Sequence, residues 1–272
     1  MINLDELKKK YEELSAKQDK TNNKDRGDSP FLKLEAGANV IRILPPKEDG
    51  LPFYTHTKIH TVKDSKGGFK YWHCRTIHSE PCPLCDAYRE LWERHNKVCK
   101  LKDHKPCDVP YGKGTMTIKG KDRYYVNCVN RKDDTIKIAS FPDSLWIKVM
   151  SCILGNEKLG LEPLGDITDL QNGYDFNIIQ TDLGGYANYN QSVAKPRPTP
   201  AGATKLAIAG YMDSLLDLKA QVRLEDFTEM KKAADTILAV NTVAIAATPA
   251  VNTEVKSSEQ ISDEQFKNQL KG

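Results

Sequence analysis

The sequence lacks any long hydrophobic run. None of its 272 residues falls in a stretch approaching the ~18 apolar residues of a transmembrane helix, so we expect no membrane contact. The opening MINLDELKKK carries charges where a secretory signal needs an apolar core, and we therefore expect no such signal. With 39% apolar and 28% charged residues, the composition is typical of a globular protein and excludes wholesale disorder, collagen and coiled coil.

The seven cysteines are an odd number. Seven cysteines cannot all pair, and a chain without a secretion signal is not expected to carry a disulfide scaffold, so metal binding is the better interpretation. The metalloenzyme patterns H-E-x-x-H and H-x-E followed by P-C-x-x-C are missing, and no paired carboxylates flank the cysteines. We therefore expect a protein that is not an enzyme, with a structural metal ion.

Positive charge is concentrated in one part of the chain. The formal net charge is only +3, but residues 56–132 contain 17 basic and 8 acidic residues, a balance of +9 that leaves −6 for the remainder. This asymmetry predicts a local anion-binding face, for which nucleic acid is the commonest large partner. The alternative is a solvated lysine-rich surface, and charge alone does not decide between them.

Short apolar runs punctuated by Gly, Pro, Asn and Asp predict a mainly β fold with helices, and favour a small barrel or sandwich over a parallel sheet. Strands are expected at 31–34, 39–44, 54–62, 69–74, 115–119, 123–130, 135–139 and 173–181. Helices are expected at 3–17, 86–100, 142–154, 206–220 and 224–239. The expected domains are an N-terminal arm (1–28), a core (29–240) with a Cys/His-rich subdomain at about 56–108, and a flexible tail (241–272).

The most specific motif is Cys82-Pro-Leu-Cys85. Two thiolates from one turn suit Zn²⁺, which prefers four N or S ligands in a tetrahedron. The other two ligands could be His60 and Cys74, or His95 and Cys99, and spacing alone does not choose between these pairs. Further candidates are His73, His78, His104 and Cys107. Cys128 and Cys152 lie in apolar runs and are expected to be buried thiols.

Aromatic residues are interleaved with basic ones at three places: Lys119-Gly-Lys121-Asp-Arg123-Tyr124-Tyr125, Gly184-Gly185-Tyr186-Ala-Asn-Tyr189 and Phe69-Lys70-Tyr71-Trp72. Such mixtures suit single-stranded nucleic acid, because cations follow the phosphates and each ring that stacks on a base contributes ~1–3 kcal/mol. The alternative for each tyrosine is packing on one face of a strand. Lys119 and Lys121 are assigned to DNA binding from charge alone.

The motifs occur in the order Gly37-Ala-Asn-Val-Ile-Arg42-Ile-Leu-Pro45, His60, Cys74, Cys82-Pro-Leu-Cys85, Arg123-Tyr124-Tyr125-x-Asn127, Leu145-Trp146 and Gly185-Tyr186-x-Asn188-Tyr189. Over roughly residues 30–240 this order resembles the T-even phage single-stranded DNA-binding (helix-destabilising) protein family. The resemblance implies an α+β protein with an OB-fold core, an inserted zinc subdomain, C-terminal helices and flexible termini.

The resemblance also implies site residues. It selects His60, Cys74, Cys82 and Cys85 as ligands of one structural Zn²⁺, with His56 as a substitute for His60. It implies DNA contacts at Arg123, Tyr124, Tyr186 and Tyr189, and a phosphate contact at Arg42.

The function implied by the resemblance is sequence-nonspecific coating of single-stranded DNA during phage replication, recombination and repair, in the cytoplasm of the infected host. The arm, with Lys8-Lys9-Lys10, would mediate self-association along DNA. The tail would recruit replication and recombination proteins, although residues 251–272 carry a net charge of only −1. The alternatives are a zinc-containing nuclease or primase-like enzyme and an RNA-binding regulator on the same fold.

Overall fold

The computed structural model describes residues 29–63, 68–98, 118–183 and 186–247. The expected N-terminal arm, its helix, and residues 248–272 of the expected tail lie outside these ranges. The chain divides into two compact units. The first contains the residues up to Thr61, Phe69–Pro81 and Gly120–Glu225, and the second contains Val62–Gly68, Cys82–Lys119 and the residues from Asp226 onward. No helix in the described ranges is long and apolar enough to cross a membrane.

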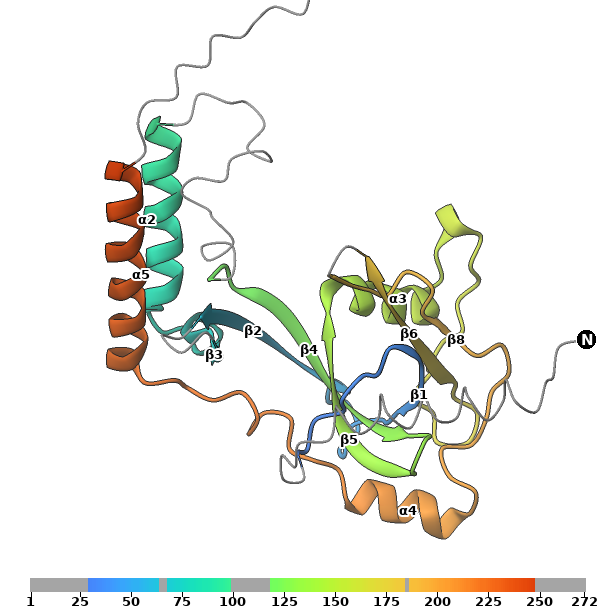
Figure 1. Cartoon of the computed structure of the whole chain (residues 1–272). Helices are drawn as coiled ribbons and strands as arrows, with labels where there is room; N and C mark the ends of the chain where they lie inside the picture. The colour runs from blue at the N-terminus through green and yellow to red at the C-terminus, as the bar shows by residue number, and fades with distance from the viewer. Residues whose placement is uncertain (1–28, 64–67, 99–117, 184–185, 248–272) are drawn as a thin grey trace, which may run out of the picture. The chain divides into compact units, whose positions relative to one another are not determined.

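The main feature of the first unit is a curled antiparallel sheet that resembles half of an OB barrel (Figure 1). The strands are β1 (Gly37–Ile43), β2 (Tyr54–Lys63), β3 (Phe69–His73), β4 (Lys121–Asn130), β5 (Thr135–Pro142), β6 (Asp175–Leu183), β7 (Tyr186–Asn188) and β8 (Val193–Ala194). Their order is β3-β2-β4-β1-β6-β7, while β5 pairs with β4 and β8 pairs with β6.

Four α-helices lie in the described ranges, and the fold is therefore of the mixed α+β class that the sequence predicts. They are α2 (Pro83–Val98), α3 (Asp143–Leu154), α4 (Lys205–Asp213) and α5 (Phe227–Ala247), with short 3-10 helices η1 (Arg75–His78) and η2 (Glu157–Leu159). Helices α2 and α5 pack side by side in the second unit (Figure 1).

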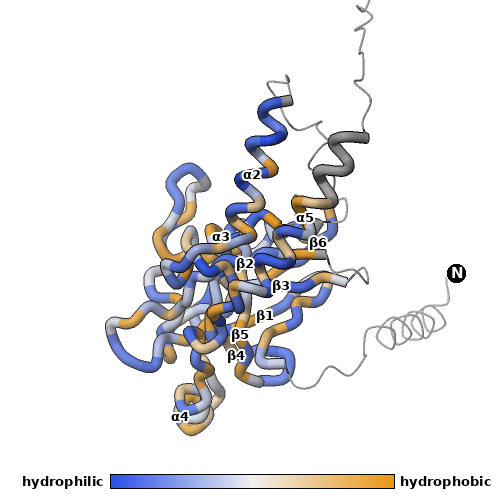
Figure 2. Tube along the Cα trace, turned by 90° about the vertical axis from the view of Figure 1, so that its left-hand side faces the viewer, coloured by the Kyte–Doolittle hydropathy of each residue, from blue (hydrophilic) through white to orange (hydrophobic). Residues whose placement is uncertain are grey.

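The packing face of α2 follows helical spacing, because Leu84, Ala87, Leu91 and His95 are all buried. Burial of Leu84 and Leu91 stabilises this unit by about 1.5–3 kcal/mol per side chain. Much of α2 is hydrophilic, whereas α4 is largely hydrophobic (Figure 2).

The main core lies on the inner face of the curled sheet, under α3. Strand β4 shows the alternation that places it there, because Val126 and Cys128 are fully buried on this face. Neighbouring strands and α3 supply the rest: Ile41, Ile43, Phe141, Phe176, Ile178, Leu145, Trp146 and Val149. This packing fixes the register of β4, which carries the predicted DNA contacts Lys121, Arg123 and Tyr124.

Helix α4 ends at Asp213, before the expected end at residue 220. The reason is a contact that is remote in sequence. The Asn127 side chain donates a hydrogen bond to the carbonyl of Leu216 (2.9 Å) and accepts one from its backbone N–H (3.1 Å). The Asp217 carboxylate accepts from the N–H groups of Lys219 and Ala220, which closes a turn where helix was expected.

Three other expectations about elements differ from the structure. Helix α5 continues to Ala247, past the expected end of that helix at residue 239. Phe31 forms only an isolated bridge to Ile138, because the 31–34 segment shares few ladder bonds with β5. The described end of the expected 115–119 strand, residues 118–119, is a turn and bend leading into β4.

Candidate nucleic-acid interface and metal centre

Tyr124 lies at the centre of a group of rings on one face of the sheet. On β4 it stands opposite His56 of β2 and Phe141 of β5. Helix α3 begins directly after β5, and its first turns bring Trp146 over Tyr124. The two rings are stacked, with centroids 4.7 Å apart and planes 8° apart.

Phe53, Tyr54, His56, Tyr124 and Trp146 form what we call the aromatic cluster. Tyr54 packs on Trp146 at 4.7 Å and on Tyr124 at 6.1 Å, while His56 lies 5.1 Å from Tyr124. Partial burial, and then the carboxylates of nearby acidic residues, raise the pKa of Tyr124.

Cations precede Tyr124 in the chain, and strand alternation places Lys121 and Arg123 on the opposite face of β4 from the Tyr124 ring. Lys119 and Lys121 are exposed where the chain enters β4, and Arg123 is partly exposed one residue before Tyr124. Asp122 Oδ1 lies 2.8 Å from His56 Nε2, and it lies 3.8 Å from Lys58 Nζ, which offsets its charge. The predicted basic-aromatic motif is thus on one strand, and Lys58 adds a cation that sequence analysis did not single out.

Tyr189 is partly buried. It packs against the main core cluster, and burial raises its pKa, an effect that the positive charge of Arg123 opposes. Arg123 therefore lies within electrostatic range of Tyr189. The backbone of Tyr186 is paired with Leu183 in the β6–β7 hairpin, but its side chain lies outside what the structure describes.

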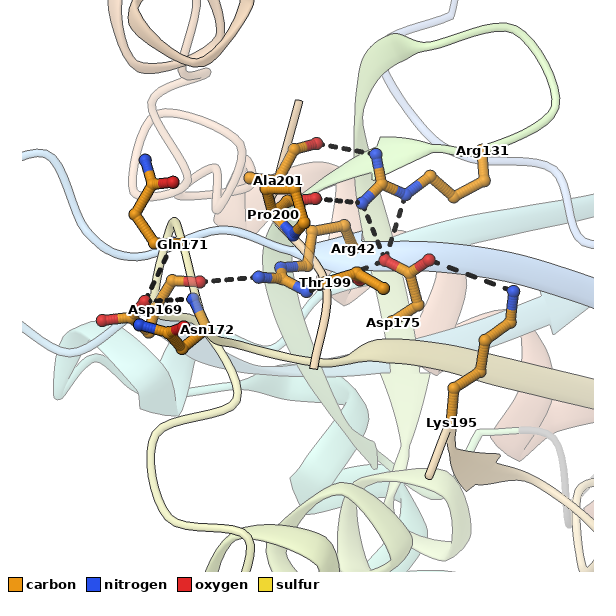
Figure 3. Close-up of polar contacts among 10 residues, drawn as sticks. All are labelled: Arg42, Arg131, Asp169, Gln171, Asn172, Asp175, Lys195, Thr199, Pro200 and Ala201. Carbon is orange, nitrogen blue, oxygen red and sulfur yellow. Dashed lines mark hydrogen bonds and ion pairs between the residues drawn. The ribbon is translucent and has the colours of Figure 1, made fainter. Parts of the chain in front are cut away.

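Arg42, for which the resemblance implies a phosphate contact, is fully buried. Its Nη2 donates to the Asp169 carbonyl (2.6 Å), its Nη1 donates to Thr199 Oγ1 (3.4 Å), and Nη1 lies 3.8 Å from Asp175 Oδ1 (Figure 3). Desolvation lowers its pKa, partly offset by Asp175. Arg42 thus connects segments of the fold that are distant in sequence.

The carboxylate of Asp175 compensates a second guanidinium in the same network. Arg131 donates to Asp175 Oδ1 from Nε (3.0 Å) and Nη2 (2.8 Å), and to the carbonyls of Pro200 and Ala201 (Figure 3). Lys195 Nζ lies 4.0 Å from Asp175 Oδ2. These contacts fasten the 199–201 segment to the sheet.

A second group of residues has the chemistry of a metal site. His60, Cys74, Cys82 and Cys85 each offer one ligand atom, and these atoms all lie within 4.8 Å of one another. They come from the end of β2, the residue after β3 and the start of α2, and three of them are buried, Cys85 being intermediate. A tetrahedral site with Zn–S of about 2.3 Å needs donor atoms about 3.8 Å apart, so this Cys₃His set fits one Zn²⁺.

Contacts around these residues support the arrangement. Thr76 Oγ1 lies 3.0 Å from Cys74 Sγ and can donate its hydroxyl to a thiolate there. The Cys74 backbone N–H donates to the Lys58 carbonyl (2.7 Å). Gly120 passes close to His60, because an added Cβ would lie 3.1 Å from the His60 Cε1 atom.

The alternative ligands are placed elsewhere. His95 is buried on α2 and its ring stacks on Trp92. His56 Nε2 bonds Asp122, and His73 Nε2 lies 3.2 Å from the Tyr125 hydroxyl. His78 is outside the group, while Cys99, His104 and Cys107 lie beyond the described residues.

The sheet and both sites fall within a segment that matches a known protein family. The family model described as gp32 DNA binding protein like matches residues 35–241. The chain belongs to this family. No curated protein matches the chain. The gp32-like family consists of DNA-binding proteins and not of enzymes, so the zinc nuclease and primase-like alternatives are set aside.

Membership supports binding of single-stranded DNA by this gp32-like chain. The match begins before β1 and ends within α5, so it covers the aromatic cluster and all four residues of the candidate metal site. Trp146 is the residue whose role sequence reasoning missed, although the motif Leu145-Trp146 belonged to the resemblance. The signal that could have found it is an indole in the first turns of a helix that directly follows a strand.

Proposed function

We propose that this gp32-like protein coats single-stranded DNA without sequence preference. Lys119, Lys121 and Arg123 neutralise phosphates, and bases stack on Tyr124, with Tyr186 and Tyr189 as further contacts. The observation that carries the proposal is the Tyr124 ring, which is stacked on Trp146 and preceded in sequence by three cations. Stacking does not depend on base identity, and phosphate contacts are sequence-blind.

Selective binding of single-stranded DNA would also destabilise the DNA double helix. A protein that binds single strands and not duplex lowers duplex stability by mass action, without a fuel molecule. The roles that follow are the coating of transient single strands in phage replication, recombination and repair, within the host cytoplasm. Self-association through residues 1–28 and recruitment of replication proteins through the tail belong to the same proposal.

Fluorescence anisotropy of labelled oligo-dT, oligo-U and a matched duplex, at two salt concentrations, tests this function. We expect tight binding of oligo-dT that weakens with salt, and weak binding of the duplex. Arg123→Gln should reduce the steepness of the salt dependence by about 0.7 for each phosphate that is no longer neutralised. Lys205→Gln, an exposed cation on α4, is the matched control. Equal affinity for oligo-dT and duplex would refute the proposal, and preference for oligo-U would favour the RNA-binding alternative.

We further propose that His60, Cys74, Cys82 and Cys85 hold one structural Zn²⁺. The donor set has three thiolates and one imidazole, which is typical of closed structural sites and leaves no ligand position for a reacting water. When bound, the ion supplies a rigid crosslink between segments far apart in sequence. Metal content per chain and thermal stability before and after chelation test this part.

A further inference from the structure

Strand β3 leaves two aromatic rings exposed that the proposed DNA site does not use. The exposed fraction is 54% for Phe69 and 66% for Tyr71. Trp72, the next residue, is only 3% exposed, and Lys70 Nζ lies 3.7 Å above its ring. Because side chains alternate along a strand, the buried Trp72 fixes the orientation of β3 and turns Phe69 and Tyr71 to its other face.

That other face also carries predicted phosphate contacts. The hydrogen bond from the Cys74 N–H to the Lys58 carbonyl sets the register between β3 and β2, so His73 stands opposite Ile59. Ile59 in turn stands opposite Lys121 of β4. The contact between His73 Nε2 and the Tyr125 hydroxyl agrees with this register, because both side chains then share one face.

Strand β3 itself carries a cation and no acid, because its five residues are FKYWH. Glu225, the nearby acid, is engaged by His73 Nδ1 at 3.5 Å. Cations beside uncovered rings are the combination that single-stranded nucleic acid requires.

We propose that Phe69 and Tyr71 form a second base-stacking platform, reached by a DNA strand that continues past Lys121 toward the β3 edge of the sheet. Residues two apart on a strand are about 6.6 Å apart, close to twice the 3.4 Å rise between stacked bases, so each ring can take one base of an extended strand. This proposal rests on the proposed function. It adds a contact at which longer strands gain affinity over shorter ones.

The test uses the full chain and labelled oligo-dT of increasing length. Relative to wild type, the Phe69→Ala/Tyr71→Ala variant should bind long oligomers about tenfold more weakly and short oligomers equally well. The salt dependence should not change, because no cation is removed. The Phe69→Tyr/Tyr71→Phe variant keeps both rings and should bind within about twofold of wild type, as should Leu206→Ala, the control for loss of an exposed side chain (83%).

A second readout does not depend on the variants. Photo-crosslinking of wild type to oligonucleotides containing 5-iodouracil should modify the peptide that contains Tyr71. The platform would be overturned if the double alanine variant bound oligomers of every length as tightly as wild type does and if no crosslink formed at Tyr71. The proposed function would still hold in that case, provided that wild type binds oligo-dT in preference to duplex. Loss of self-association in that variant, without loss of DNA affinity, would overturn it in favour of a protein-contact surface. Failure of wild type to prefer oligo-dT over duplex would instead refute the proposed function.

Discussion

The indole of Trp146 and the phenol ring of Tyr124 lie parallel, with 8° between their planes and 4.7 Å between their centroids. One ring comes from a helix and the other from a strand, and the β5–α3 junction aligns them. Trp146 covers one face of Tyr124 and limits its rotation, so a base that stacks on Tyr124 meets a ring that is already ordered.

Tyr124→Ala should weaken binding of oligo-dT by ~1–3 kcal/mol, because one stacking surface is removed. Tyr124→Phe should keep most of the affinity, since it keeps the ring. Tyr211→Ala, a partly buried tyrosine that packs on the α4 side of the fold, is the control and should affect stability without this loss. Anisotropy titrations check both. Equal losses in the two alanine variants would contradict a stacking role for Tyr124.

Cys82→Ser should lose the bound metal and lower the melting temperature, because a hydroxyl is a poor zinc ligand. Elemental analysis of the purified protein and a thermal melt measure the two effects. Cys128→Ala is the matched control, since Cys128 is buried in the main core and outside the ligand group. A full zinc complement in Cys82→Ser would show that the ligand assignment is wrong.

Stability should fall as the pH rises from about 9 to about 12. Full burial raises the pKa of the Cys128 thiol from 9.0 to about 12, so in this range the unfolded chain releases that proton and the native chain does not. The unfolded state therefore binds fewer protons, and the free energy of unfolding decreases by up to about 1.4 kcal/mol per pH unit from this group. Urea unfolding across the range should give a flatter dependence for Cys128→Ala, and an unchanged slope would refute the assignment.

Gly173→Ala should destabilise the protein by about 1–3 kcal/mol. A Cβ there would lie 2.5 Å from the backbone oxygens of Ile167 and Asp169 and 2.7 Å from Arg42 Nη2. Gly210→Ala is the matched control, because its Cβ would meet nothing within 4 Å and α4 gains a better helix former. Urea midpoints should move in opposite directions, and a shared direction would contradict the steric role of Gly173.

Asp175→Asn should cost several kcal/mol of stability, since it leaves the guanidinium groups of Arg42 and Arg131 without their shared carboxylate. Arg42→Met should also destabilise the fold but leave the salt dependence of DNA binding unchanged. Arg131→Met serves as comparison, because it removes the other cation of the network. A reduced salt dependence in Arg42→Met alone would indicate a phosphate contact at Arg42.

Local pattern was sufficient for much of the sheet. Short apolar runs bounded by Gly, Pro, Asn and Asp predicted β1, β2 and β4. The sequence resemblance selected the four clustered metal-ligand candidates, whereas spacing left His95 and Cys99 open. Only the arrangement of β2, β3 and α2 brings His60 and Cys74 to Cys82.

The remaining differences depend on contacts distant in sequence. Arg42 matches a motif, but its partners are carbonyl, hydroxyl and carboxylate groups more than a hundred residues away, for example Asp169 at a separation of 127. The early end of α4 likewise depends on Asn127, whose amide holds Leu216. Propensity and periodicity do not contain such partners.

The three tryptophans occupy three different environments, which gives the protein an internal optical probe. Trp146 stacks on Tyr124, Trp72 is a buried residue of β3, and Trp92 on α2 is 38% exposed. A base that stacks on Tyr124 should quench the emission of Trp146 and leave the other two indoles largely unchanged. Replacing Trp92 and Trp72 by phenylalanine would isolate that emission, so occupancy of the aromatic cluster could be followed in unlabelled protein.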